Sequence, residues 1–238
     1  MADIAVKACL NGGRTRAEHP AVPQTPAELA ADAIAVRRAG AFAVHVHPRD
    51  GRGRETMAGD ACDAAVAAIR AAAPGLPVGL STTAAINPDP FARAAAVRAW
   101  RRAPDFVSVN LSELGWAGIV RAALHAGIAV EAGLATPADA EQLAASPFTH
   151  QVLRVLIEVE GGADEARAIA DLIPAEVSQL WHGFGERTWH VLPAGIAAGH
   201  AVRVGLEDVL VLPDGSPAAS NGDLVAAAVA LASSAQTG

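Results

Sequence analysis

The sequence contains only two cysteines, Cys9 and Cys62, among its 238 residues. They lie far apart in unlike surroundings, so neither a disulfide framework nor a thiolate zinc site is indicated. Basic residues are also scarce: the sequence has 18 lysines and arginines against 25 aspartates and glutamates, which gives a formal net charge of −7. A surface that binds nucleic acid needs a basic stripe, so no nucleic-acid partner is expected.

Uninterrupted apolar runs of membrane-spanning length are missing too, although 52% of the residues are hydrophobic. Asp, Glu, Arg or Pro interrupts every run well before that length. The first ten residues, MADIAVKACL, lack the basic region and long apolar stretch of a signal peptide. We therefore expect a soluble, cytoplasmic protein with no membrane partner.

Short β-rich runs alternate with Ala-rich amphipathic segments along the whole chain. Strands are predicted at residues 4–10, 42–47, 78–80, 106–109, 128–131, 152–157, 177–181 and 201–204. Helices are predicted at residues 26–38, 60–73, 90–102, 116–125, 137–145, 163–172, 188–198 and 221–232. This alternation implies parallel strands joined by right-handed crossovers.

About eight such units in a chain of this length predict an α/β fold, namely a single compact (β/α)8 TIM barrel over residues 1–238. A doubly wound open sheet is the competing fold. It usually carries G-x-G-x-x-G after its first strand, and the run Asn11-Gly12-Gly13-Arg14 is too short for that motif.

In such a barrel, catalytic groups come from the C-terminal ends of the strands and the loops just beyond them. Polar side chains are predicted at these ends and not at the opposite ends. They are Asn11, Arg14, His45, His47, Arg49, Ser81, Thr82, Asn110, Glu131, His182, Arg203, Glu207 and Asp208. This asymmetry is typical of an enzyme.

The stretch VHVHPRD places His45 and His47 one residue apart in a predicted strand. Side chains alternate between faces along a strand, so both imidazoles point the same way and could bind one metal ion. Glu207 is a candidate third ligand, because two histidines and one carboxylate leave an open position for water or substrate. The alternatives are two separately hydrogen-bonded core histidines and a salt-bridged loop glutamate.

Four stretches carry a resemblance to a known family: LNGGRTRAEHPAVPQTPAEL, AGAFAVHVHPRDGRG, VGLSTT and HAVRVGLEDVLVLPDGSPAASN. They occur in this order over nearly the whole length, and the combination of HxHxRD with RVGLED is specific. On these motifs the sequence resembles the β-keto acid cleavage enzymes.

The resemblance implies a zinc-dependent retro-Claisen exchange, in which a β-keto acid and acetyl-CoA become acetoacetate and a new CoA thioester. By position, it implies that His45, His47 and Glu207 bind Zn²⁺, that Asp208 is the general base and that Arg203 works beside it. Ser81 corresponds to a polar residue of the substrate site. A homo-oligomer is also expected.

Asn11, Thr82, Asn110, Glu131 and His182 are further candidates for substrate binding, and Glu131 matches a family carboxylate position on the fifth strand. Arg14 stands where the amino-substrate enzyme has a carboxylate. This reversal of charge argues against an amino-bearing substrate and for an anionic or uncharged polar one. The alternative is a surface arginine that pairs with Glu18.

The chain is shorter than typical members between the third and sixth strands, where loops help to hold CoA. Two alternatives to the exchange reaction therefore stay open. One is a metal-dependent C–C or ester hydrolase that needs no CoA, and the other is an inactive barrel that binds a metal or a small anion.

Overall fold

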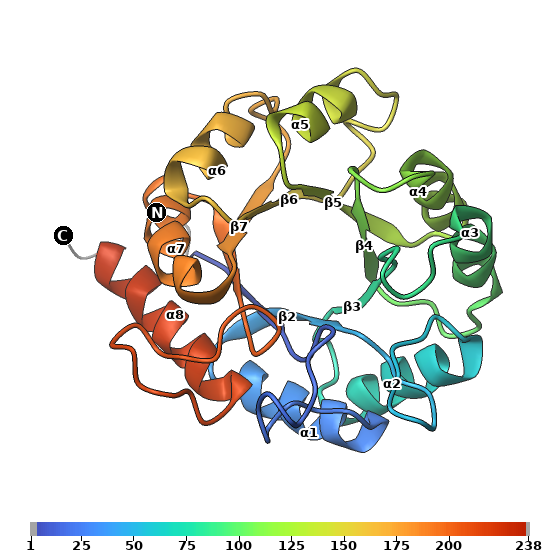
Figure 1. Ribbon diagram of the computed structural model, residues 1–238, viewed down its shortest axis with the longest axis horizontal. Helices are drawn as coiled ribbons and strands as arrows, with labels where there is room; N and C mark the ends of the chain where they lie inside the picture. The colour runs from blue at the N-terminus through green and yellow to red at the C-terminus, as the bar shows by residue number, and fades with distance from the viewer. Residues whose placement is uncertain (1–3, 237–238) are drawn as a thin grey trace.

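The computed structural model describes residues 4–236, so residues 1–3 of the N-terminal stretch considered above lie outside it, as do residues 237–238. Eight parallel strands close into a barrel in chain order, with the first strand pairing the last. Helices surround this barrel (Figure 1). The predicted (β/α)8 fold is confirmed. No helix in the described range is both long and apolar enough to cross a bilayer.

The strands are β1 (Val6–Cys9), β2 (Ala41–Val46), β3 (Val78–Ser81), β4 (Phe106–Asn110), β5 (Ala129–Leu134), β6 (Arg154–Val159), β7 (Gln179–Gly183) and β8 (Ala201–Val204). The helices are α1 (Pro26–Arg38), α2 (Gly59–Ala72), α3 (Pro90–Ala99), α4 (Trp116–His125), α5 (Pro137–Ala144), α6 (Ala163–Ala170), α7 (Thr188–Ala197) and α8 (Asn221–Gln236). A short 3₁₀ turn, η1 (Gly185–Arg187), precedes α7.

Local capping explains why several helices begin where the sequence predicts. At the start of α1, the Thr25 hydroxyl accepts a hydrogen bond from the Glu28 main-chain N–H, and the Glu28 carboxylate accepts one from the Thr25 N–H. This reciprocal capping box satisfies N–H groups that have no partner within the helix. Helix α3 ends three residues earlier than predicted, at Ala99, because Trp100 adopts an extended backbone and its indole donates to the Met57 carbonyl at 3.0 Å.

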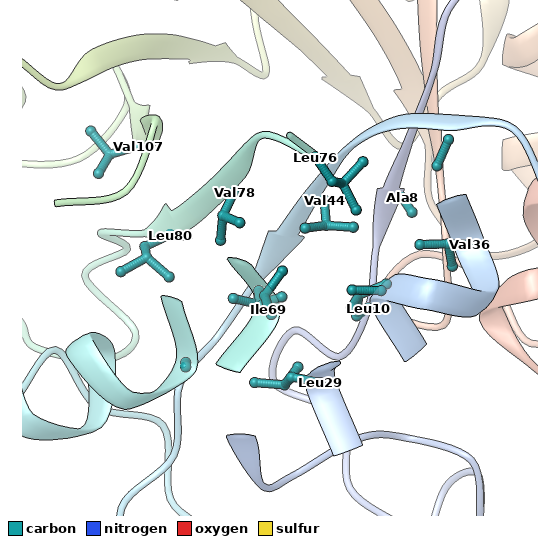
Figure 2. Close-up of a cluster of buried hydrophobic side chains, with 14 of the residues drawn as sticks. Ala8, Leu10, Leu29, Val36, Val44, Ile69, Leu76, Val78, Leu80 and Val107 are labelled. Atoms are coloured by element: carbon teal, nitrogen blue, oxygen red, sulfur yellow. The ribbon is translucent and has the colours of Figure 1, made fainter. Parts of the chain in front are cut away.

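The main hydrophobic core lies between the barrel and its helices (Figure 2). On the side of β1 to β3, buried strand residues such as Val44 and Val78 face Leu29 of α1 and Ile69 of α2. Alternating strand residues point outward into this core, so the remaining ones point into the barrel. The barrel interior is therefore free to carry polar side chains.

A buried ion cluster occupies the barrel interior. The Glu131 carboxylate accepts from Lys7 Nζ at 2.5 Å and from Arg154 Nε at 2.6 Å, and both Lys7 and Glu131 are fully buried. The expectation that Glu131 ends the fifth strand was wrong, because β5 continues to Leu134. Glu131 lies in mid-strand, and each of its carboxylate oxygens already has a cationic partner.

Candidate metal centre and barrel mouth

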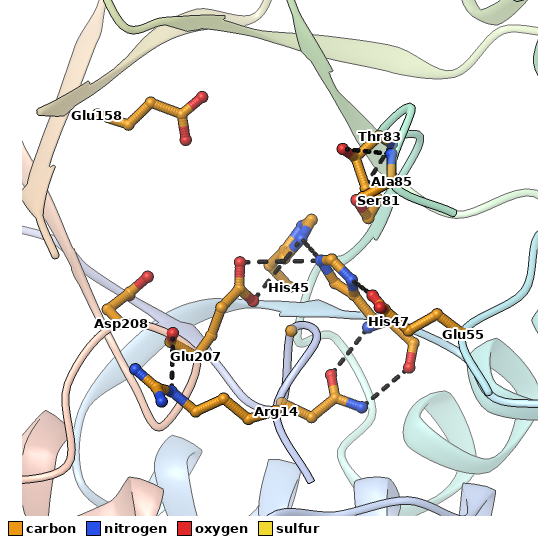
Figure 3. A network of polar contacts seen from close by, with 12 residues as sticks. Arg14, His45, His47, Glu55, Ser81, Thr83, Ala85, Glu158, Glu207 and Asp208 are labelled. Atoms are coloured by element: carbon orange, nitrogen blue, oxygen red, sulfur yellow. Dashed lines mark hydrogen bonds and ion pairs between the residues drawn. The ribbon is translucent and has the colours of Figure 1, made fainter. Parts of the chain in front are cut away.

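The two histidines and Glu207 meet at the C-terminal end of the barrel (Figure 3). His45 lies in β2, His47 directly follows that strand, and Glu207 lies in the turn after β8. β1 pairs with both β2 and β8, so residues that are about 160 positions apart in sequence become neighbours across one strand. Barrel closure therefore explains how these three side chains converge.

The ligand atoms of these three residues all lie within 4.8 Å of one another. His45 Nε2 is 3.1 Å from His47 Nε2, and Glu207 carboxylate oxygens lie 4.0 Å from His45 Nε2 and 3.8 Å from His47 Nε2. Ligands of a tetrahedral ion with bonds of about 2.0–2.2 Å are roughly 3.3–3.6 Å apart. The spacing fits one metal ion after a small movement of Glu207.

A polar atom without a partner also indicates a cation here. Glu207 Oε2 is buried and has no hydrogen-bond partner among the described residues, and it lies on the side of the two His Nε2 atoms. Burial, followed by the nearby charge of His47, holds the pKa of His45 well below its usual range. His45 is therefore a neutral imidazole, which is the form that binds metal.

The backbone on the β1 side of the site is shaped to admit Glu207 and to hold His47. Gly12 has a positive φ of 50°, and a Cβ at this position would come within 2.4 Å of Glu207 Cγ. Asn11 is fully buried; its amide oxygen accepts from the His47 N–H at 2.9 Å, and its amide nitrogen donates to the carbonyls of His47 and Pro23. The Asn11 side chain therefore supports His47 and is not directed at a ligand, contrary to the sequence-based expectation.

Glu55 is a site residue that the sequence reasoning missed. It lies in the loop after β2, and its carboxylate contacts His47 Nδ1, the ring nitrogen that faces away from His45 and Glu207 (Figure 3). A carboxylate on the second nitrogen of a metal-binding histidine fixes the tautomer and the ring orientation. The only signal in the sequence was a glutamate eight residues after His47.

Arg203 and Asp208 form a buried ion pair beside Glu207. Arg203 Nη2 lies 2.7 Å from Asp208 Oδ1, and Nε lies 3.2 and 3.1 Å from the two carboxylate oxygens. Arg203 also donates to Glu207. Burial would lower the pKa of Arg203, but Asp208 and other nearby groups outweigh it and hold that pKa well above its usual range. The guanidinium thus stays charged and links the metal-ligand candidate to the base candidate.

Ser81 and Thr82 behave differently although they are adjacent. Ser81 ends β3 in the barrel mouth, where its hydroxyl oxygen accepts only a long contact from the Thr83 N–H at 3.4 Å. Thr82 is fully buried and donates to the Ser108 carbonyl at 2.6 Å. The Ser81 hydroxyl is therefore available to a ligand, whereas the Thr82 hydroxyl already donates its hydrogen to the backbone of β4.

Three further side chains line the mouth, namely Asn110 on β4, Glu158 on β6 and His182 on β7. Glu158 was not predicted; it projects into the mouth from β6, on the opposite side from His45 and His47 (Figure 3). Its Oε2 lies 3.4 Å from His182 Nε2. His182 Nδ1 in turn lies 3.7 Å from Asp208 Oδ1.

Arg14 lies beneath Glu207 and Asp208 (Figure 3). Its Nε donates to the Glu207 carbonyl at 3.3 Å, and its Nη1 donates to Glu18 at 3.1 Å. The pairing with Glu18, which the sequence left open as the alternative, is present. Arg14 therefore supports the turn that carries Glu207 and forms a solvent-exposed ion pair with Glu18.

The chain matches the family described as BKACE, beta-keto acid cleavage enzyme, over residues 3–159 and 152–237. The 3-keto-5-aminohexanoate cleavage enzyme of Fusobacterium nucleatum is 23% identical over 254 residues, which cover 98% of this chain and 92% of that protein. The enzyme of the same name from Acetoanaerobium sticklandii is 26% identical over 255 residues, with the same coverage.

Solved structures share the barrel. ObcA bound to oxaloacetate matches with a TM-score of 0.67 and 19% identity, over 87% of this chain and 62% of the ObcA chain. This chain thus spans less than two thirds of ObcA. A 3-hexulose-6-phosphate synthase from Salmonella typhimurium matches with a TM-score of 0.57 and 16% identity, over 97% of this chain. These likenesses show the fold alone. The family match, in contrast, extends over most of the sequence, and on that ground the chain belongs to the beta-keto acid cleavage enzymes.

Proposed function

We propose that this protein is a zinc-dependent enzyme that exchanges a β-keto acid with acetyl-CoA to give acetoacetate and a new CoA thioester. The observation that carries the proposal is the convergence of His45, His47 and Glu207 next to the buried Arg203–Asp208 pair. These residues supply a candidate metal-ligand set and a candidate base in one barrel mouth, in a chain of the cleavage-enzyme family.

Two imidazoles and one carboxylate are a common protein ligand set for catalytic zinc, and they leave one position open. His45, His47 and Glu207 would hold the ion, and Glu55 would orient His47. When bound, zinc would supply Lewis-acid polarisation of the substrate's keto acid group.

Asp208 is the proposed general base. The carbon between the ketone and the carboxylate of a β-keto acid bears the acidic proton, and Asp208 removes it. The resulting carbanion forms a bond to the acetyl carbon of acetyl-CoA and displaces CoA thiolate. The thiolate then adds to the ketone of the original acyl group, the original carbon–carbon bond breaks, and acetoacetate leaves after Asp208 returns the proton. Arg203 holds the Asp208 carboxylate in a fixed orientation throughout.

Ser81 is the proposed hydrogen-bond donor to a substrate oxygen. Its hydroxyl accepts weakly from Thr83, and no acceptor for its proton is present in residues 4–236. A hydroxyl that faces the mouth in this way can rotate and donate a hydrogen bond to a substrate oxygen that gains negative charge during the reaction.

Coenzyme A as co-substrate is supported by the family and by a structure of ObcA, described as a ternary complex with a C4-CoA adduct and oxalate. Hydrolysis without CoA is the competing reaction. The test is to incubate the zinc-loaded protein with a panel of β-keto acids, with and without acetyl-CoA, and to measure acetoacetate and the new thioester. We expect both products in equal amounts and only with acetyl-CoA. Release of acetate and the shorter carboxylic acid without acetyl-CoA, above the spontaneous loss of CO2 measured without protein, would establish a hydrolase instead.

A further inference from the structure

Arg49 belongs to the VHVHPRD stretch, but it is not one of the three candidate metal ligands. Its terminal guanidinium nitrogens donate to main-chain carbonyls. Nη2 donates to the Gly12 carbonyl at 2.8 Å and to the Arg14 carbonyl at 2.6 Å, and Nη1 donates to the Gly53 carbonyl at 3.1 Å. Its side chain forms no ion pair with a carboxylate in residues 4–236, so its polar contacts there are to the backbone.

The three carbonyls belong to two different loops. Gly12 and Arg14 lie in the loop after β1, and Gly53 lies in the loop after β2. The main chain of Arg49 also forms an antiparallel bridge with Glu55. Arg49 therefore fastens the loop after β1 to the segment that carries Glu55.

The loop after β1 supports Glu207. The Gly12 backbone lies against this side chain, because a Cβ on Gly12 would come within 2.4 Å of Glu207 Cγ. Arg14 Nε donates to the Glu207 carbonyl at 3.3 Å (Figure 3). Gly12 and Arg14 thus contact Glu207 and, through their carbonyls, also hold Arg49. A shift of this loop would move the support of Glu207.

The loop after β2 supports His47 through Glu55, and the two loops lie close together at this point. The Glu55 carboxylate contacts His47 Nδ1, and its Oε2 is 3.3 Å from the position that a Cβ on Gly13 would occupy. The spacing of the loops therefore limits where this carboxylate can lie. Asn11 links the same two loops at the strand ends, through the His47 backbone, and Arg49 links them farther along.

The shape of the arginine side chain suits this link. A guanidinium is planar and carries N–H groups on separate nitrogens at fixed angles. One terminal nitrogen of Arg49 serves the loop after β1, and the other serves the loop after β2. A lysine has all its donors on one flexible ammonium, so it would not hold both loops at the same spacing.

We propose that Arg49 is a positioning residue of the metal centre. By fixing the two loops to each other, it holds Glu207 and Glu55 in place relative to His45 and His47 before an ion binds. The inference rests on the proposed function in taking the two histidines and Glu207 as zinc ligands. Loss of the link should weaken zinc binding, although the side-chain hydrogen bonds of Arg49 reach only backbone carbonyls.

The test is zinc affinity, which requires no turnover. Metal-free wild type, Arg49→Lys and Arg49→Met compete for zinc with a chromophoric chelator. Partners that orient metal ligands change metal affinity by about 10–100-fold, and we expect a loss of this size in both variants. Arg52→Lys and Arg52→Met are the matched controls, because Arg52 is exposed in the same loop and hydrogen-bonds there through its main-chain N–H. Both controls should bind zinc as the wild type does.

A double-variant cycle separates positioning from a general loss of stability. Arg49→Lys acts partly through Glu55, so the loss of zinc affinity that it causes should be at least about threefold smaller in a Glu55→Gln background. Arg52→Lys should show no such coupling to Glu55→Gln. Losses that simply multiply in the double variant would mean that Arg49 and Glu55 act independently, and would overturn the proposal.

Unchanged zinc affinity in both Arg49 variants would also overturn it. Failure of both variants to fold, seen as a loss of cooperative unfolding in the metal-free protein, would assign Arg49 to the stability of the whole barrel and refute a positioning role. Acetoacetate formation from β-keto acids with acetyl-CoA is measured on the same samples. Turnover by the wild type with unchanged zinc affinity in the variants would refute the positioning role but keep the proposed function. Weakened zinc affinity in the variants without turnover by the wild type would do the opposite, and a wild type that binds no zinc would refute both.

Discussion

Glu131→Gln separates a structural role of this carboxylate from a substrate-binding one. Glu131 lies between Lys7 and Arg154 inside the barrel, with contacts of 2.5 and 2.6 Å. Glutamine keeps the shape of the side chain but removes the negative charge. The Lys7 ammonium, which is 0% exposed, then loses its counter-charge in a place that water does not reach.

Removing one partner of a buried ion pair costs about 3–5 kcal/mol, because the remaining charge is left uncompensated. A domain of this size changes its Tm by roughly 2–4 °C per kcal/mol. Glu131→Gln should therefore lower the Tm by about 6–20 °C. Zinc content should not change, because no atom of Glu131 contacts His45, His47 or Glu207.

The pH dependence provides a second measure of the same effect. Burial would raise the pKa of Glu131, but Lys7 and Arg154 outweigh it and lower the pKa from 4.5. A lowered pKa stabilises the fold above the unfolded value, and this stabilisation is lost as the pH falls through the folded value. The Tm difference between wild type and Glu131→Gln should therefore be full near neutral pH and shrink in acid.

Thermal unfolding of wild type, Glu131→Gln and the exposed control Glu160→Gln is the assay. The double variant Lys7→Met with Glu131→Gln should recover part of the lost stability, because it removes the stranded ammonium. An unchanged Tm, together with a raised KM for the β-keto acid, would refute this reasoning and restore the substrate-binding role.

Three further predictions concern the mouth and the α1 helix. Asp208→Asn should reduce turnover by about 10²–10⁴-fold and leave the zinc content unchanged. Glu207→Gln should lower both turnover and zinc content, and rate assays with metal analysis on the same samples test the two variants. Glu55→Gln should weaken zinc affinity by roughly 10–100-fold at unchanged Tm of the metal-free protein, as measured by competition with a chelator, because His47 loses its orienting carboxylate. Burial raises the pKa of Asp32 to about 6, so its ionisation destabilises the fold as the pH rises. Asp32→Asn should therefore gain about 2–3 kcal/mol over wild type above the folded pKa of about 6, and little below the ordinary value of 3.8 at which the unfolded chain ionises, by denaturant unfolding at both pH values.

The sequence predicted the order and type of all eight strands and eight helices in the described range. The signals behind this prediction are local, and tertiary contacts do not override them. They are hydrophobic periodicity, capping motifs such as Thr25 to Glu28, and glycines at helix ends. The predicted ends of the strands were less accurate, and this error changed the interpretation of Glu131. A predicted end at residue 131 placed the carboxylate in the mouth, but β5 runs on to Leu134 and leaves it deeper in the barrel.

Side-chain roles in the mouth were harder to predict than positions. Asn11 and Thr82 lie at the correct end of the barrel, yet both hydrogen-bond to backbone groups contributed by distant segments. Glu55 and Glu158 were missed for the converse reason. Each looks like an ordinary solvated glutamate in sequence, and only tertiary contacts turn one toward His47 and the other toward His182.

The charges of the mouth can now be assigned pair by pair. Arg203 pairs with Asp208 inside the barrel mouth, and Arg14 pairs with Glu18 at its edge, so both arginines already have a carboxylate partner. A divalent ion at the histidines would therefore supply the positive charge for the carboxylate end of a substrate. Such an ion would fix that end of the substrate before any hydrogen bond to Ser81 forms, so the loss of a metal ligand should affect substrate orientation as well as polarisation.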